Sequence, residues 1–124
     1  MSPAAPPRLP DYLQHIGVAI QRIQRYVAGL SSAAFATDDK TQDAVLRNIE
    51  VIGEAARNVQ RHHADYAAAH AEVPWALMVG MRNRVSHGYF AVDWDLIWAM
   101  VQQDLPALLA QVNAPLTEQG AAGA

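Results

Sequence analysis

The chain has 124 residues, of which 52% are hydrophobic, and it carries a formal net charge of -3. This length and composition are typical of one globular domain with its own core, and they exclude an intrinsically disordered protein. The negative balance argues against a protein that coats nucleic acid through bulk positive charge, although a local basic cleft is compatible with it.

Both ends of the chain are predicted to be flexible tails. Residues 1–10 contain four prolines, which cannot donate backbone hydrogen bonds and so disfavour an early helix. Residues 114–124 are rich in alanine and glycine, and Leu116 is their only large apolar side chain. The sequence therefore predicts a single folded domain over residues 11–113.

The domain is predicted to begin with a long amphipathic helix. Its apolar residues recur at alternating steps of three and four, the spacing of one helix face, over about 18 residues. They are Leu13, Ile16, Ile20, Ile23, Val27 and Leu30. Gly29 and the Ser31-Ser32 pair mark the end of this helix.

A second amphipathic helix follows, with Thr37, Asp38 or Asp39 available as its N-cap. Its apolar stripe consists of Val45, Ile49, Ile52, Ala56 and Val59. A charged stripe beside it consists of Asp43, Arg47, Glu50, Glu54, Arg57 and Arg61. Opposite charges one turn apart, such as Asp43 with Arg47 and Glu54 with Arg57, favour a solvated face with weak ion pairs. The alternative is that this stripe forms the polar wall of a cleft.

Residues 62–73 are rich in alanine and contain three histidines, which predicts a short helix or a loop. Pro74 suits the start of a helix that runs from Trp75 toward His87. Gly88 is expected to be the C-cap of that helix.

Asp93 is expected to cap a last helix, which Pro106 should bend because proline lacks a backbone N–H. Its apolar stripe consists of Ile97, Val101, Leu105, Leu108 and Val112. Strand-like alternation and repeats of fixed period are both missing from the sequence. The pattern therefore indicates an all-α fold, an up-and-down bundle of four to five helices.

The use of charged and sulfur-containing residues narrows the chemistry. The chain contains no cysteine, which excludes a disulfide framework, a zinc finger and a thiol nucleophile. Lys40 is its only lysine, so nearly all positive charge belongs to arginine, whose guanidinium can bind a phosphate through two parallel hydrogen bonds.

No apolar run approaches the roughly 20 residues of a membrane span, and the N-terminus lacks the basic-then-apolar order of a signal peptide. We expect a cytoplasmic protein without membrane contact.

The segment from Arg82 to Tyr89 holds the strongest signal for a functional site. The Arg82 guanidinium is always charged and suits a phosphate, while the His87 imidazole can exchange protons near neutral pH. Gly88 lets the backbone turn, so that Tyr89 can approach both side chains. In a helix, Asn83 would share a face with His87. The combination suggests phosphodiester chemistry.

Ser86 would lie one helical turn from Arg82, and we expect Ser86 and Asn83 to support the two main residues. Cleavage of RNA without a metal requires a base, an acid and a cation that stabilises the phosphorane. One chain supplies a single good acid/base group, His87. Two copies around a two-fold axis would supply two, which predicts a homodimer with a shared cleft.

Neither a metal nor a cofactor is expected. His63 and His70 could share one helix face near His62, but no carboxylate or third ligand follows at the usual spacing.

The segment and its surroundings resemble the HEPN-domain toxins of the HepT kind. The likeness rests on Arg82-x4-His87-x-Tyr89, which is followed by Phe90 and Asp93, and it covers roughly residues 12–109. Further matching segments are Ile52-Gly53-Glu54-Ala55-Ala56, Trp75 to Met81, and Leu105-Pro106. Arg84 departs from the family's spacing and is ranked below Arg82.

This resemblance implies a small helical endoribonuclease that is active as a dimer and serves as the toxin of a type II toxin-antitoxin system. Matched by position, Arg82 and His87 are its catalytic residues, and Asn83 occupies the polar position after the motif arginine. The antitoxin of the family is a minimal nucleotidyltransferase that transfers AMP from ATP to the motif tyrosine, here Tyr89. Such a modification would place phosphate against the site and block the RNA substrate.

Other interpretations stay open at this point. Arg82 and His87 could form an ordinary helix C-terminus, and Tyr89 could be a core aromatic residue. The functional alternative is a non-catalytic interaction module that binds a nucleotidyltransferase and presents Tyr89 or a substrate to it. The three tryptophans are expected in the core or in a dimer interface. They are Trp75, Trp94 and Trp98.

Overall fold

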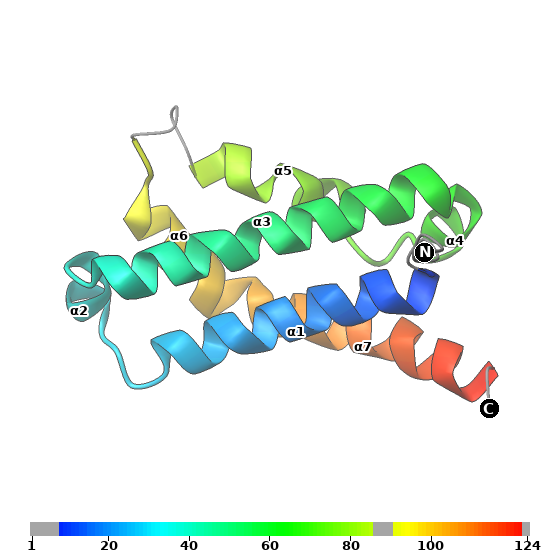
Figure 1. Cartoon of the computed structure of the whole chain (residues 1–124), viewed down its shortest axis with the longest axis horizontal. Coiled ribbons are helices and arrows are strands. Elements are labelled where there is room, and N and C mark those ends of the chain that lie inside the picture. Colours follow the sequence, from blue (N-terminus) through cyan, green and yellow to red (C-terminus); the bar gives the residue numbers. More distant parts are fainter. Residues whose placement is uncertain (1–7, 86–90, 123–124) are drawn as a thin grey trace, which may run out of the picture.

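The computed structural model of the chain describes residues 8–85 and 91–122, with side chains as far as residue 113. These residues form seven α-helices and no strand (Figure 1). The helices are α1 (Leu9–Val27), α2 (Ser32–Ala36), α3 (Asp39–His62), α4 (Ala64–Ala69), α5 (Trp75–Val85), α6 (Trp94–Gln103) and α7 (Leu105–Ala122). The all-α prediction is confirmed. The expected four to five helices become seven because the short α2 is added and the last helix divides.

The long helices α1, α3, α5 and α7 alternate in direction, as predicted for an up-and-down bundle (Figure 1). α3 packs against α1 and also against α5, while α7 packs against α1. α1 and α3 lie side by side, with α5 along the upper edge of α3 in Figure 1. α3 is therefore the central helix of the bundle, and its contact with α5 determines where the side chains of α5 lie.

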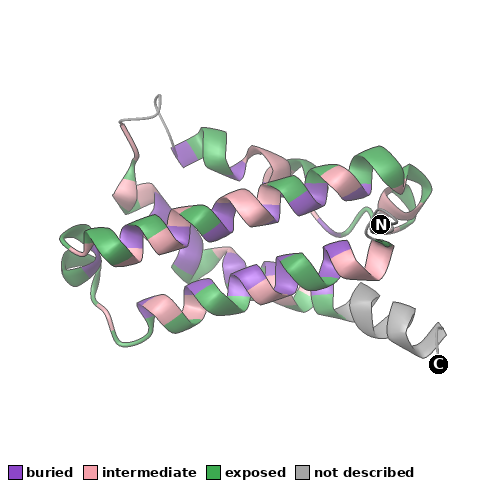
Figure 2. Ribbon diagram, viewed as in Figure 1, coloured by how far each residue is buried: buried purple, intermediate pink, exposed green. Residues whose placement is uncertain are grey.

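The apolar stripes predicted from the sequence form the core. The faces of α1 and α3 that meet inside the bundle are buried, and their outer faces are exposed (Figure 2). All predicted stripe residues of α3 and of α6 and α7 are buried, as are those of α1 up to Val27. Leu30 lies beyond α1, which ends before Gly29 because that residue has a φ of 78°, in the left-handed region.

α1 begins at Leu9, inside the predicted N-terminal tail. Pro10 lies in the first turn, where the backbone N–H groups have no partner in the helix, so the missing N–H costs nothing. The Asp11 carboxylate accepts a hydrogen bond of 2.9 Å from the backbone N–H of Arg8. The local capping thus offsets the effect expected of the prolines.

The predicted last helix is two helices, α6 and α7, which are separated at Asp104. Asp93 caps α6 as expected, since its Oδ1 accepts a hydrogen bond of 3.0 Å from the N–H of Leu96. Pro106 has no backbone N–H to donate to the carbonyl four residues earlier, so the helix divides where a bend was predicted. α7 continues to Ala122, past residue 113, where the sequence suggested a tail.

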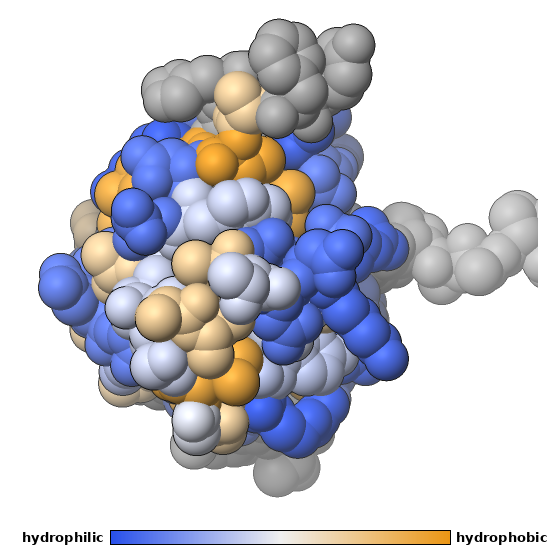
Figure 3. Space-filling view, turned by 90° about the vertical axis from the view of Figure 1, so that its left-hand side faces the viewer, coloured by the Kyte–Doolittle hydropathy of each residue, from blue (hydrophilic) through white to orange (hydrophobic). Residues whose placement is uncertain are grey.

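An aromatic cluster joins α2 to α6. The Phe35 ring is buried, and its centroid lies 6.1 Å from that of Trp94 and 5.4 Å from that of Trp98. The Nε2 of buried Gln42 donates to the Phe35 carbonyl at 2.9 Å, which fixes α2 on α3. Figure 3 views this end of the molecule and shows hydrophobic side chains in small areas between hydrophilic ones. The two tryptophans thus pack against the core, as predicted.

The helices of the described ranges are all too short or too polar to cross a membrane.

Candidate functional site

The contact between α3 and α5 is close because Gly53 of α3 has no side chain. A Cβ at this position would lie 3.3 Å from the Met78 carbonyl oxygen and 3.5 Å from the Val79 carbonyl oxygen. The α5 backbone can therefore approach α3 directly at this point. Gly53 belongs to the Ile52–Ala56 segment that the sequence singled out, and its role there is packing.

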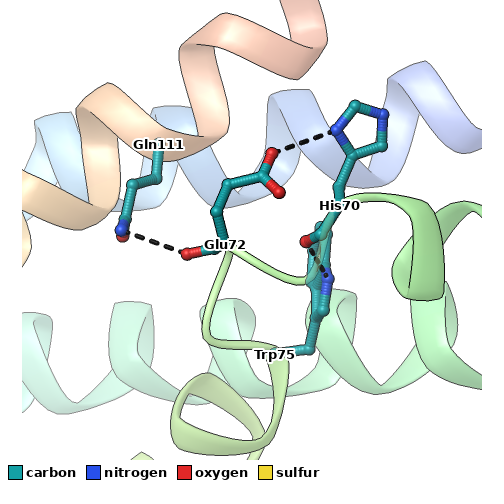
Figure 4. Close-up of polar contacts among 4 residues, drawn as sticks. All are labelled: His70, Glu72, Trp75 and Gln111. Carbon is teal, nitrogen blue, oxygen red and sulfur yellow. Dashed lines mark hydrogen bonds and ion pairs between the residues drawn. The ribbon is translucent and has the colours of Figure 1, made fainter.

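The start of α5 is tied down by polar contacts of the turn that precedes it (Figure 4). The indole N–H of Trp75 donates to the His70 carbonyl at 3.1 Å, and the ring itself is buried. The Gln111 side-chain amide of α7 donates to the Glu72 carbonyl at 3.2 Å. These bonds connect α5 to the rest of the bundle at one end, so that its direction along α3 is defined.

The Glu72 carboxylate also takes part in this turn. Its pKa lies below the ordinary value, because the backbone N–H of its own residue and the His70 ring both form hydrogen bonds with it. The Nδ1 of His70 lies 3.2 Å from Glu72 Oε1. This contact further stabilises the turn that leads into α5.

Arg82 on α5 contacts α3 through an ion pair with Glu50. The two side chains meet with Nε and Oε1 2.9 Å apart, and they are 56% and 37% exposed. A pair so open to solvent contributes little to the free energy of unfolding. Its main effect is geometric, because it restricts where the Arg82 guanidinium can point.

A groove of about 800 Å³ crosses the outer face of α3 and reaches α1 on one side and α5 on the other. Its charged and polar lining includes His15, Arg47, Glu50, Glu54, Arg57, Arg82 and Asn83. We call it the arginine groove. Its formal charge is +1, from three arginines and two glutamates, whereas the whole chain has -3. Such a groove can bind an anion that the protein as a whole would repel.

The structure places only part of the predicted site. Arg82 and Asn83 are exposed and both line the arginine groove. Ser86, His87 and Tyr89 lie outside the described residues, as does the expected cap Gly88.

Arg84 and His15 differ in their position relative to the arginine groove. Arg84 is exposed and does not contribute to the described lining of the groove, whereas Arg82 does. His15 of α1 is exposed and lies at the α1 side of the groove.

Glu50 is the site residue that sequence reasoning did not single out. The expected ion pairs of Asp43 with Arg47 and of Glu54 with Arg57 do not form among the residues described, whereas Glu50 pairs across to α5. The position of Glu50 in the charged stripe was visible, but its partner depends on which side of α3 faces α5. The charged stripe thus contributes a wall of the arginine groove, the second of the two interpretations.

Across residues 8–85 and 91–122, histidines, aspartates and glutamates nowhere gather in threes that could hold a metal ion.

Comparisons with known proteins give one consistent result. The family model described as Ribonuclease HepT-like matches residues 16–114. The chain is 40% identical over 98 residues to "Probable ribonuclease HepT" of Thermococcus cleftensis, which covers 79% of this chain and 86% of that protein. It is 32% identical over 108 residues to "Putative RNase TTE0752" of Caldanaerobacter subterraneus subsp. tengcongensis, which covers 87% and 94%. No solved structure gives a significant match.

Proposed function

The chain belongs to the HepT-like ribonuclease family, and we propose that it is an endoribonuclease that cleaves RNA without a metal ion. Arg82 and His87 are its catalytic residues, and Asn83 and Ser86 support them. The observation that carries this proposal is the position of Arg82, which Glu50 holds at 2.9 Å on the rim of a groove with a positive formal charge.

The chemistry needs one nucleophile, one leaving group and two proton transfers. A base removes the proton of the ribose 2′-hydroxyl, whose oxygen attacks the adjacent phosphorus while the bond to the 5′-oxygen breaks. An acid gives its proton to that 5′-oxygen. The products are a 2′,3′-cyclic phosphate and a 5′-hydroxyl end. Arg82 would stabilise the negative charge on the phosphorane, and His87 would transfer protons.

A homodimer would complete this site. A single imidazole cannot serve at once as base and as acid on opposite sides of the phosphate. Two His87 side chains from two protomers in a shared cleft would divide the roles, which supports a two-fold symmetric dimer.

The test is a cleavage assay on RNA in a chelating buffer, in which wild type is compared with His87→Ala. We expect wild type to produce fragments with cyclic phosphate ends and the variant to leave the RNA intact. If both leave RNA equally intact while a complex with a nucleotidyltransferase still forms, the protein is the non-catalytic interaction module.

We further propose that the protein is a cytoplasmic toxin of a type II toxin-antitoxin system and that a minimal nucleotidyltransferase neutralises it. In that reaction the Tyr89 phenol oxygen attacks the α-phosphorus of ATP, and pyrophosphate leaves. The added phosphate would compete with the substrate for Arg82. Incubation with the nucleotidyltransferase and ATP should add the mass of one adenylyl group, AMP less one water, to wild type but not to Tyr89→Phe. Equal labelling of both proteins would exclude Tyr89 as the acceptor.

A further inference from the structure

Two arginines of the arginine groove, Arg47 and Arg57, lie outside the motif that contains Arg82. Both belong to α3 and both are exposed. Each has an acidic residue within one helical turn, yet neither forms an ion pair in the part of the chain that the structure describes. Both arginines line the groove, and no ion pair between described residues neutralises either guanidinium.

The spacing of these arginines suits a chain of phosphates better than a single anion. Ten residues separate Arg47 from Arg57, which corresponds to about 15 Å along a helix axis. One nucleic-acid strand places a phosphate about every 3.4 Å in a duplex, and farther apart when extended, so this interval covers more than one phosphate. Glu50, and with it Arg82, lies between the two positions along α3.

The two glutamates of the groove do not cancel this pattern. Glu50 is occupied by Arg82 at 2.9 Å, which leaves Glu54 as the acidic residue that faces Arg47 and Arg57. Arg47 and Arg57 of α3 thus line the same groove as Arg82 of α5, and neither of the two is paired as Arg82 is. Repeated arginines on one face are the electrostatic footprint of a polyanion.

We propose that Arg47 and Arg57 bind the phosphates on either side of the scissile phosphate, so that a single RNA strand runs along the outer face of α3. This inference rests on the proposed ribonuclease function, because Arg82 defines the scissile position. Arg47 and Arg57 are binding residues and take no part in proton transfer.

The experiment measures binding of a fluorescein-labelled single-stranded RNA by anisotropy at several salt concentrations. His87→Ala serves as the background, so that the RNA stays uncut. Arg47→Ala and Arg57→Ala should each weaken binding several-fold. Each should also make the negative slope of log K against log salt shallower by about 0.7, the contribution of one phosphate contact to a single strand. Arg47→Lys should keep the slope, because it keeps the charge.

Arg22→Ala is the matched control. Arg22 is an exposed arginine of α1 that is not part of the described groove lining, and its removal should leave affinity and slope unchanged. Unaltered slopes for both groove variants, with RNA still bound, would overturn the inference.

Two further outcomes separate this inference from the proposed function. If wild type cleaves RNA while Arg47→Ala and Arg57→Ala, made without the His87→Ala substitution, bind and cleave it equally well, only the inference fails. If wild type neither binds nor cleaves RNA, the proposed function fails.

Sedimentation of the variants tests a different role for the two arginines. A mass of Arg47→Ala or Arg57→Ala that differs from wild type, without a changed salt slope, would assign the two arginines to a contact between copies of the chain and overturn the inference.

Discussion

Helix α3 has an apolar inner face and an outer face that carries charged side chains. The inner face consists of apolar side chains, and Val45, Ile49 and Ile52 are fully buried. The outer face carries Arg47 and Glu50, which line the arginine groove. Only one or two residues separate the faces in sequence, yet one is expected to determine the stability of the bundle and the other its activity. Substitutions along a single helix can therefore separate the two properties.

The largest effect is expected from the inner face. Ile52→Ala removes three methyl or methylene groups from a fully buried site and should lower the free energy of unfolding by about 2–5 kcal/mol. Urea denaturation measures this value. Glu54→Ala, on the exposed face two residues later, should change it by less than about 0.5 kcal/mol. Equal losses in both variants would mean that the two faces are not distinct.

The role of the outer face is tested by Glu50→Gln. This substitution removes the charge that orients Arg82 and keeps the shape of the side chain. We expect the kcat of RNA cleavage to fall by about 10- to 100-fold, since small misplacements of a catalytic group are costly. KM should stay level or fall, because a negative charge leaves the groove. The melting temperature should hardly change.

Glu54→Gln is the matched control for that measurement. It also removes one negative charge from the groove, but no ion pair with Arg82. A kcat loss as large as that of Glu50→Gln would show that charge in the groove, and not the orientation of Arg82, controls the rate.

The contact between α3 and α5 is tested by alanine substitutions at two glycines. Gly80→Ala adds a Cβ with nothing within 4 Å, and it should stabilise the protein by about 0.5–1 kcal/mol through helix propensity. Gly53→Ala brings the same gain, but its Cβ meets the Met78 carbonyl of the α5 backbone at 3.3 Å. We expect that contact to cancel the gain and to reduce RNA cleavage. Thermal melts that rise equally for both variants would contradict the close approach of α3 and α5.

The smallest effect concerns pH at the start of α3. The Thr41 hydroxyl and backbone N–H donate to Asp38 and hold its pKa below the ordinary 3.8. A lowered folded-state pKa gives stability that is present above the unfolded value and lost as the pH falls through the folded value. Wild type should therefore exceed Asp38→Asn in stability at pH 6, with a difference that narrows below about pH 4. A difference independent of pH would contradict this role.

The inner face and the outer face also differ in how far the sequence predicts them. A stripe such as Val45, Ile49 and Ile52 is a local pattern, so periodicity alone identifies it and the helix it lies on. The caps Asp38 and Asp93 were predictable for the same reason, because each acts within three residues of its own position. The short α2 was missed because five residues carry no periodic signal.

The arginine groove could not be predicted in this way. The contact of Glu50 with Arg82 joins residues far apart in sequence, and it depends on Gly53 and on the turn before Trp75, which together set how α5 lies on α3. The sequence predicted Arg82 and Asn83 as site residues because they belong to a short motif. Their surroundings on α3 required the three-dimensional arrangement.

We expect the forked guanidinium of Arg82 to bind the phosphate of RNA. Arg82→Lys keeps the charge and removes the fork, and Arg84→Lys makes the same change at an arginine that does not line the groove as described. Cleavage rates of a single-stranded RNA in a chelating buffer provide the measurement. We predict that Arg82→Lys loses most of the activity and that Arg84→Lys keeps it. Full activity of Arg82→Lys would show that the guanidinium fork is not needed and would leave Arg82 a structural residue at the end of α5.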